Sequence, residues 1–288
     1  MSSALSTASA EQLYPDGLIA PGYYADVSNH YYHHVSHGTS SSKLKLFFEH
    51  ETDARARHYW LNPEPASAAM RLGTAVHSLV LEPHNFEHDN FVTASDHWSA
   101  LKTARDTYPE MNIITPSQYD AAQRMRDNVL GHPYVSQLMQ NGIAEVSVWQ
   151  DIEFYDEKSG CTQTEFAKCR IDWMPSNAPY LVDLKSAAVA SPDGFRDACH
   201  RFEYYLSACL YSRIANQCSE LMRATGFAQR DTFIFIVVEN KPPYSVAWYE
   251  MGLESRGHGN LQLSESLSRL CWARKNDWPA HNEKCLVI

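Results

Sequence analysis

The 288-residue sequence lacks the features that would place it in several common classes of protein. Its seven cysteines are an odd set without a Cys-x-x-Cys pair, which argues against a zinc ribbon and against a secreted disulfide framework. The polar start lacks the basic and apolar segments of a signal peptide, and no apolar run reaches the roughly 18 residues that suggest a membrane span. We therefore expect a soluble protein of a reducing compartment, with no membrane association.

Positive charge is also scarce. The chain has 24 Lys and Arg against 34 Asp and Glu, for a net charge of -10. A protein that coats nucleic acid is usually basic, because neutralising phosphates supplies most of the non-specific affinity. An acidic protein that handles DNA must gather its cations in a groove, or let bound metal offset its carboxylates. The charge lowers the expectation of a DNA function without excluding one.

Hydrophobic patterning predicts one large domain. Residues 1–20 are rich in Ser and Ala and are expected to form a disordered tail. Residues 21–288 are expected to form a single domain, with a mostly helical part over 21–143 and a catalytic core over 144–288. Apolar spacing predicts a helix after Ser42 and helices over 68–82, 117–140 and 192–217. Pro83 ends the helix over 68–82.

Strand patterns begin near residue 144. Alternating or apolar segments predict strands over 145–156, 164–173, 180–184, 232–239 and 245–251. The run over 232–239 is nearly all apolar, which is typical of a buried central strand. The predicted order along the chain is therefore several helices, three strands, a helix, two strands and helices in the last part. This order predicts an α/β or α+β fold with one mixed sheet flanked by helices.

Acidic residues and a lysine lie where these strands could bring them together. Asp172 ends one predicted strand, while Asp183 and Lys185 lie two apart on the next and so project to the same face. Carboxylates suit Mg²⁺, which could orient water for phosphodiester hydrolysis, with Lys185 as electrostatic group or proton acceptor. A surface ion pair of little energetic value is the alternative, although the strand is otherwise apolar. The bare Asp-x(10)-Asp-x-Lys pattern is weak evidence by itself.

Five ordered motifs make the chain resemble the RecE-type exonucleases (exonuclease VIII and its phage relatives), within the RecB-like PD-(D/E)xK nucleases. The resemblance runs from about Tyr23 to Trp278. The closest match is MRLGTAVH at 70–77 with LEP at 81–83, similar to the family's GTAxHxxxLEP motif. The others are the opening YYADVSNHYYHH with SSSKLKLF, CRID at 169–172, VDLKS at 182–186, and the aromatic residues Phe195, Tyr204, Tyr205 and Tyr211 on the following helix.

The resemblance implies a restriction-endonuclease-like core and a role for each matching residue. It makes His77 a metal ligand beside Asp172, Asp183 and the Leu184 carbonyl, with Mg²⁺ as cofactor and Mn²⁺ as substitute. Lys185 becomes the catalytic lysine, and Glu145 becomes a carboxylate that positions water or a second metal. Without the family, His77 would be read as a hydrogen-bonded core histidine and Glu145 as a surface residue.

Six residues are weaker candidates for contacts with DNA or with a 5′-phosphate: Ser40, Ser42, Arg71, Arg170, Ser207 and Tyr211. Ser40 and Ser42 precede a predicted helix, where hydroxyl and free N–H groups suit an anion, although ordinary N-capping explains them as well. Arg170 could equally be the structural partner of a core carboxylate. The basic residues Lys43, Lys45, Arg71, Arg196 and Arg201 are candidates for lining a DNA channel. The histidines at 30, 33, 34 and 37 lack zinc-site spacing, so we expect packing or solvent exposure for them.

One position departs from the family. The helix after the lysine strand usually carries Gln about four residues before the Tyr that is here Tyr211, but position 207 is serine. Serine is shorter and donates one hydrogen bond rather than two. The departure leaves open a catalytically weakened protein that still binds DNA ends.

The resemblance implies a metal-dependent 5′-to-3′ exodeoxyribonuclease that degrades linear double-stranded DNA, leaving 3′ overhangs for recombination by strand annealing. It also implies a homo-oligomeric ring (a trimer or tetramer), a RecT-type single-strand annealing protein as partner, and the cytoplasm of a bacterial or phage-infected cell. A structure-selective or single-strand nuclease of the same fold is the alternative within enzymes, because fold does not fix substrate.

Overall fold

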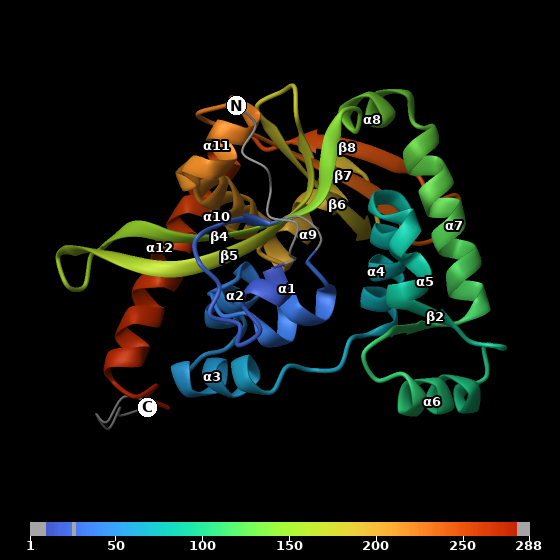
Figure 1. Cartoon of the computed structure of the whole chain (residues 1–288), viewed down its shortest axis with the longest axis horizontal. Coiled ribbons are helices and arrows are strands. Elements are labelled where there is room, and N and C mark those ends of the chain that lie inside the picture. Colours follow the sequence, from blue (N-terminus) through green and yellow to red (C-terminus); the bar gives the residue numbers. More distant parts are fainter. Residues whose placement is uncertain (1–9, 25–26, 281–288) are drawn as a thin grey trace.

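A six-stranded mixed sheet forms the centre of the computed structural model, which describes residues 10–24 and 27–280 (Figure 1). The strand order is β1-β4-β5-β6-β7-β8. Only β6 and β7 pair in parallel; the other neighbours are antiparallel. The strands are β1 (Gly22–Tyr24), β4 (Gly142–Asp156), β5 (Cys161–Pro175), β6 (Tyr180–Ala187), β7 (Thr232–Glu239) and β8 (Val246–Glu250). The expected mixed sheet flanked by helices is confirmed.

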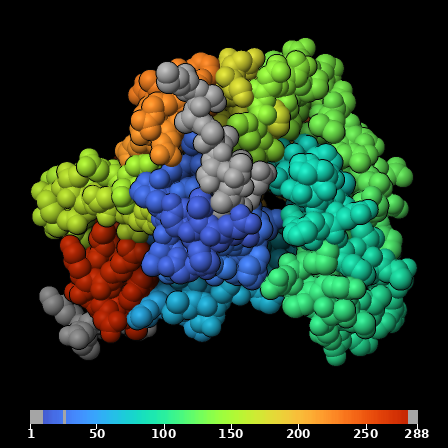
Figure 2. Space-filling model, in the orientation of Figure 1, coloured from blue at the N-terminus to red at the C-terminus, as the bar shows by residue number. Residues whose placement is uncertain are grey.

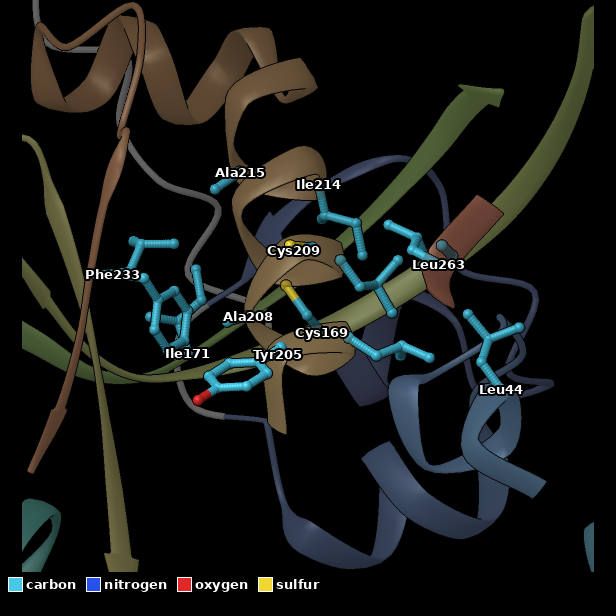
Figure 3. Packing of buried hydrophobic residues seen from close by; sticks show 14 of the residues in the cluster. Leu44, Cys169, Ile171, Tyr205, Ala208, Cys209, Ile214, Ala215, Phe233 and Leu263 are labelled. Atoms are coloured by element: carbon cyan, nitrogen blue, oxygen red, sulfur yellow. The ribbon is translucent and has the colours of Figure 1, made fainter. Parts of the chain in front are cut away.

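Helices cover both faces of the sheet. One face packs against α2 (Ser41–Glu49), α9 (Pro192–Arg201), α10 (Tyr204–Gln217), α11 (Ser219–Thr225) and α12 (Leu253–Lys275). Figure 3 shows the centre of this cluster, where Cys209 and Ile214 of α10 lie among Leu44, Ile171 and Leu263. The other face packs against α4 (Ala68–Leu81), α5 (Phe86–Asp89), α7 (Pro116–Gly131) and α8 (Pro133–Leu138). The sheet thus separates two hydrophobic clusters, as its alternating strands require.

The remaining elements are short or peripheral. They are α1 (Ala10–Leu13), the π-helical turn at Tyr31–Val35, α3 (Asp53–Leu61), the 3-10 turn at Pro83–Asn85, α6 (Trp98–Thr107), and the parallel pair β2 (Asn90–Val92) and β3 (Asn112–Ile114). In space-filling view the α4–α8 region forms a lobe beside the N-terminal region, with a narrow hollow between them (Figure 2). The part before β4 is mostly helical, but it also contributes β1 to the main sheet.

The N-terminal segment differs from expectation. Residues 1–9 of the expected tail lie outside the described residues, but Ala10–Leu13 is helical and both Ala10 and Ile19 are buried. They join Val27, Tyr31 and Tyr32 in a small cluster over Trp149 of β4. Burying this aromatic side chain holds the segment, an effect that composition alone does not reveal.

Two expected helices are each divided in the structure. The helix expected over 117–140 ends at Gly131, because Pro133 disfavours a helical conformation at His132. The helix expected over 192–217 divides into α9 and α10 at Phe202 and Glu203, where Glu203 has a φ of 51°. This break turns α10 so that its apolar residues face the sheet.

Candidate metal centre

Three side chains from three different elements come together at the middle of the sheet. His77 of α4, Glu145 of β4 and Asp172 of β5 each offer a ligand atom, and these atoms lie within 4.8 Å of one another. His77 Nδ1 lies 3.6 Å from Asp172 Oδ2 and 3.9 Å from Glu145 Oε1. His77 Nε2 lies 2.6 Å from the Leu184 carbonyl oxygen. The predicted donors at His77, Glu145, Asp172 and Leu184 are therefore brought together.

Strand register explains how the two carboxylates meet. Ala144 pairs with Trp173 and Val146 with Ile171, so Glu145 stands opposite Asp172 on the neighbouring strand. Glu145 has a φ of 51°, a left-handed conformation that is costly for a side chain other than glycine. Ala144 packs in the cluster beneath α4, whereas Val146 packs in the cluster beneath α10. The unusual backbone at Glu145 thus accompanies a change of face within β4.

Asp172 is held in place where β5 and β6 separate. Trp173 of β5 pairs with Val182 of β6 in the sheet. Next to this pair, Asp172 Oδ2 accepts a hydrogen bond of 2.7 Å from the Leu184 backbone N–H. The carboxylate thereby replaces a backbone partner that the splayed strand has lost. The same bond fixes Leu184, whose carbonyl faces His77.

The electrostatics of the cluster favour a bound cation. Burial raises the pKa of Asp172 to about 7, and Asp183 and Glu145 contribute while His77 opposes. Burial lowers the pKa of His77, but Asp172 and Glu145 outweigh it and raise the value to about 9. The two carboxylates therefore stabilise a proton on His77, and a divalent cation bound at the same place would displace it. One imidazole nitrogen with carboxylate and carbonyl oxygens is a donor set that suits Mn²⁺ and Mg²⁺.

Asp183 and Lys185 lie beside this cluster and pair with each other. Lys185 Nζ is 2.5 Å from Asp183 Oδ2, so the two side chains form a close ion pair. The predicted ligand Asp183 is thus not among the three grouped side chains, although its charge reaches Asp172. Burial lowers the pKa of Lys185, but Asp183 and Asp172 more than compensate and raise it above its ordinary value. The lysine is therefore a cation rather than a proton acceptor in this arrangement.

Tyr204 and Lys45 are neighbours of the lysine that the sequence motifs did not assign to the site. Lys185 Nζ lies 5.2 Å from the centre of the Tyr204 ring, and Lys45 Nζ lies 5.3 Å from it. Burial and the nearby charge of Lys185 lower the pKa of Lys45 to about 8. The place of Tyr204 among the aromatic residues of the family's last motif was the available signal for it.

Arg170 is occupied by the protein itself. Its guanidinium donates to Ser147 Oγ at 2.9 Å, to Asn29 Oδ1 at 2.7 Å and to the Val27 carbonyl at 2.8 Å. It also lies 3.8 Å from Glu145 Oε2. These contacts favour the structural alternative, in which Arg170 ties the segment before the π-helical turn to β4 and orients Glu145.

The remaining candidates lie on α4 and α10 and at the start of α2. Ser40 precedes α2, and its hydroxyl contacts Ser42 Oγ at 2.8 Å without capping the helix. Ser207 is buried on α10, and Tyr211 lies one turn later, where burial and then Tyr32 and Asp183 raise its pKa. Arg71 is half-buried on α4, and burial followed by the charge of Arg105 lowers its pKa, so it lies near another cation.

The early histidines do not add a second centre. His33, His34 and His37 are exposed, and His30 lies 3.8 Å from the exposed Glu110. In the part of the chain that the structure describes, the one group able to hold a metal is the His77 cluster. No helix among those residues is long and apolar enough to cross a membrane.

Comparison with known proteins bears on the fold and the family of the chain. The structure is similar to that of a Eubacterium rectale protein described as a "putative exonuclease", with 14% identity, a TM-score of 0.57, and coverage of 87% of this chain and 90% of that one. A second structure, described as SSO0001, has 12% identity and a TM-score of only 0.32 over 84% of this chain and 85% of that one. No curated protein sequence matches the chain. Residues 40–288 match the family described as "PDDEXK-like domain of unknown function (DUF3799)", and the chain therefore belongs to this PD-(D/E)xK-like family.

Proposed function

We propose that the chain is a metal-dependent 5′-to-3′ exodeoxyribonuclease of RecE type that acts on linear double-stranded DNA. The observation that carries the proposal is the meeting of His77, Glu145 and Asp172 within 4.8 Å, beside the Asp183–Lys185 pair. These are the residues that the sequence motifs single out, although α4 and the strands lie far apart in the chain. A nuclease fold supports the class of enzyme, while substrate and polarity belong to the proposal.

His77, Asp172, Glu145 and the Leu184 carbonyl would hold the metal, and Asp183, whose charge reaches Asp172, would join them on binding. A divalent ion in this place supplies Lewis acidity and activates water for phosphodiester hydrolysis. Among the protein groups, Arg170 and the Leu184 N–H keep the two strand carboxylates oriented. Lys185, kept cationic by Asp183, offers its ammonium group to the scissile phosphate or the attacking water.

The start of α2 would receive the 5′-phosphate of the DNA end. Ser40 does not use its hydroxyl to cap the helix, so Ser40 and Ser42 can both turn hydroxyl groups to an anion beside free N–H groups. Lys45 on the same helix brings a second cation next to Lys185. Together these groups would place the first phosphodiester of a DNA end against the metal centre.

The cellular setting follows from the same proposal. The enzyme would form a ring of three or four copies around DNA and leave 3′ overhangs for a RecT-type annealing protein in the cytoplasm of a bacterial or phage-infected cell. Ser207 in place of the usual Gln favours a second candidate, a catalytically weakened protein that binds DNA ends. A structure-selective or single-strand nuclease is the remaining alternative.

Digestion of 5′-phosphorylated linear duplex DNA tests the assignment. Wild type is expected to release nucleotides with Mg²⁺ or Mn²⁺. The rate of release by Asp172→Asn and by Lys185→Ala should be at least about 100-fold lower, because electrostatic stabilisation of the transition state is removed. Lys241→Ala, at an exposed lysine, is the matched control. A wild type inert with both metals on duplex, single-stranded and flapped DNA would refute the enzyme and favour the binding protein.

A second substrate separates the nuclease alternatives. An enzyme that needs an end leaves nicked circular duplex largely intact while it degrades the same DNA after linearisation. Equal cleavage of both forms, or a preference for flapped or single-stranded DNA, would instead support a structure-selective nuclease.

A further inference from the structure

A polar cavity lies away from the metal centre, between α10, α12 and the loop that leads into β7. Its volume is about 380 Å³, and its lining includes Arg213, Asn216, Arg230, Asp231 and Arg256. Figure 1 shows α10, α11 and α12 side by side in this part of the molecule. Three arginines and one aspartate therefore surround one cavity, in a chain whose net charge is -10.

Arg230 is the residue that most needs explanation. It is only 1% exposed, and its Nε and Nη2 atoms are buried without a hydrogen-bond partner. The guanidinium carbon lies 5.3 Å from the centre of the Phe227 ring, but an aromatic ring accepts no conventional hydrogen bond. A buried cation without an acceptor is destabilising, because its lost hydration is not replaced. An anion in the cavity would supply the missing acceptors.

The other two arginines point to the same requirement. Arg256 also has a buried Nε without a partner, while its Nη2 donates to the Asp231 carbonyl. Arg213 is half-buried, and burial lowers its pKa. Within the described residues, none of the three forms an ion pair. Asp231 also lines the cavity, and among the described residues its carboxylate forms no ion pair with any of them.

The loop that carries Arg230 is fixed to α10. The Arg230 backbone N–H donates to Asn216 Oδ1 at 2.8 Å, and Asn216 Nδ2 lies 3.5 Å from the Arg230 carbonyl oxygen. These contacts hold the arginine in place before any ligand arrives, which lowers the entropic cost of binding. A preorganised set of guanidinium groups is well suited to the oxygen atoms of a phosphate.

We propose that this cavity binds a phosphate group, carried either by a free phosphate compound such as a mononucleotide or by the backbone of a DNA strand. The cavity is larger than a phosphate requires and leaves room for an attached sugar, since small-molecule sites are typically about 300–1,000 Å³. It is separate from the metal centre. Asp231 precedes the start of β7, whereas Lys185 pairs with Val237 six residues later, about 20 Å along the strand at ~3.3 Å per residue.

Calorimetric titration of the full chain with inorganic phosphate, in chelator and a chloride buffer, tests the proposal without any cleavage. Wild type is expected to bind phosphate, whereas Arg230→Gln and Arg213→Gln should each weaken binding at least about tenfold through loss of a charge-assisted contact. Arg223→Gln, at an exposed position of α11 outside the cavity lining, is the matched control. Because no metal is present, the result is independent of whether the chain is a nuclease.

A second readout separates a binding role from a structural one. Arg230→Gln should unfold at the same or a higher urea concentration than wild type without phosphate, because an unpaired buried charge is removed. Tighter binding of a 5′-deoxymononucleotide than of phosphate identifies a free ligand, and tighter binding of an oligonucleotide identifies a DNA strand. No heat of binding with wild type at about 10 mM phosphate, a thousandfold above the micromolar range, would overturn the proposal. Unchanged binding by Arg230→Gln would also overturn it.

Discussion

Glu145 combines a ligand position with a strained backbone. Glu145 lies near the start of β4, opposite Asp172, where its φ is 51° and Arg170 lies 3.8 Å from its carboxylate. Left-handed conformations cost a residue with a side chain roughly 1–2 kcal/mol. Strain of this kind persists where surrounding contacts determine the conformation, and it is commonly found at functional sites.

Two substitutions separate the strain from the loss of the carboxylate. Both Glu145→Ala and Glu145→Gly remove the ligand, but only glycine relieves the left-handed conformation. The glycine variant is expected to be the more stable by about 1 kcal/mol in urea unfolding without metal. An alanine variant of equal or greater stability would show that β4 relaxes and that the observed backbone is not strained.

Lys168 is a buried cation whose partners are neutral oxygens. Its Nζ donates to the Tyr32 and Ser36 carbonyls and to Ser36 Oγ, and burial followed by the charges of Lys43 and Arg170 lowers its pKa to about 7. The unfolded chain, with an ordinary lysine pKa, therefore binds more protons than the folded chain between pH 7 and about 10. Stability from this residue should rise as the pH rises through that window.

Lys168→Met removes this titration while keeping the length of the side chain. Between pH 7 and 9, the free energy of unfolding of wild type should increase relative to that of the variant, by at most about 1.4 kcal/mol per pH unit for one proton. Urea unfolding of both proteins at several pH values measures the difference. Parallel curves would mean that Lys168 keeps its ordinary pKa in the folded chain.

At the scale of elements, α4 is positioned by a glycine. A Cβ added at Gly73 would lie 3.0 Å from Ser186 Oγ of β6, closer than most contacts allow. Gly73 and His77 are four residues apart and share a helix face, so the close approach at Gly73 brings His77 to the Leu184 carbonyl. The glycine and histidine of the GTAxH motif thus serve the same contact between α4 and β6.

The size of the residue at position 73 should therefore control the metal-dependent activity. Gly73→Ala is expected to stay close to wild type, because the Ser186 hydroxyl can rotate away. Gly73→Leu should lower the metal-dependent nuclease activity about 100-fold by moving α4, since a displacement of about 1 Å at a catalytic group can lower a rate that much. Nuclease assays together with circular dichroism distinguish this from unfolding. A folded leucine variant with full activity would contradict the role of the close approach.

At the scale of the whole molecule, the acidic charge and the proposed ring belong together. A chain with a net charge of -10 can act on DNA if copies gather their cations around a channel while acidic surfaces face outward. Lys43 and Lys45 of α2 lie on the side of the sheet that carries Lys185, which agrees with such a channel.

Light scattering on the purified chain tests the ring. The expected mass is three or four times 32.7 kDa, and it should persist at moderate salt because closed rings bury apolar as well as charged surface. A monomer at all concentrations would contradict the ring without affecting the metal centre, which is built within one chain.

The sequence by itself determined the five strands from residue 142 onward and the placement of Asp172, Asp183 and Lys185 on two of them. Alternating residues fix which side chains share a face, and a nearly all-apolar run such as 232–239 is stable only as a buried strand. The alternation and the apolar run both involve only residues that are close in sequence, so they can be recognised without knowledge of the fold. Family motifs added His77, which spacing alone would have left as a core histidine.

Only the tertiary structure decided which of these residues meet. His77 reaches the Leu184 carbonyl across 107 positions of sequence, Arg170 turns to residues 27–29, and Asp183 pairs with Lys185 instead of joining the grouped donors. The cavity around Arg230 likewise joins α10, α12 and a loop that no local pattern connects. Such contacts arise when helices pack against a sheet, because packing brings together side chains whose separation along the chain carries no information about their distance.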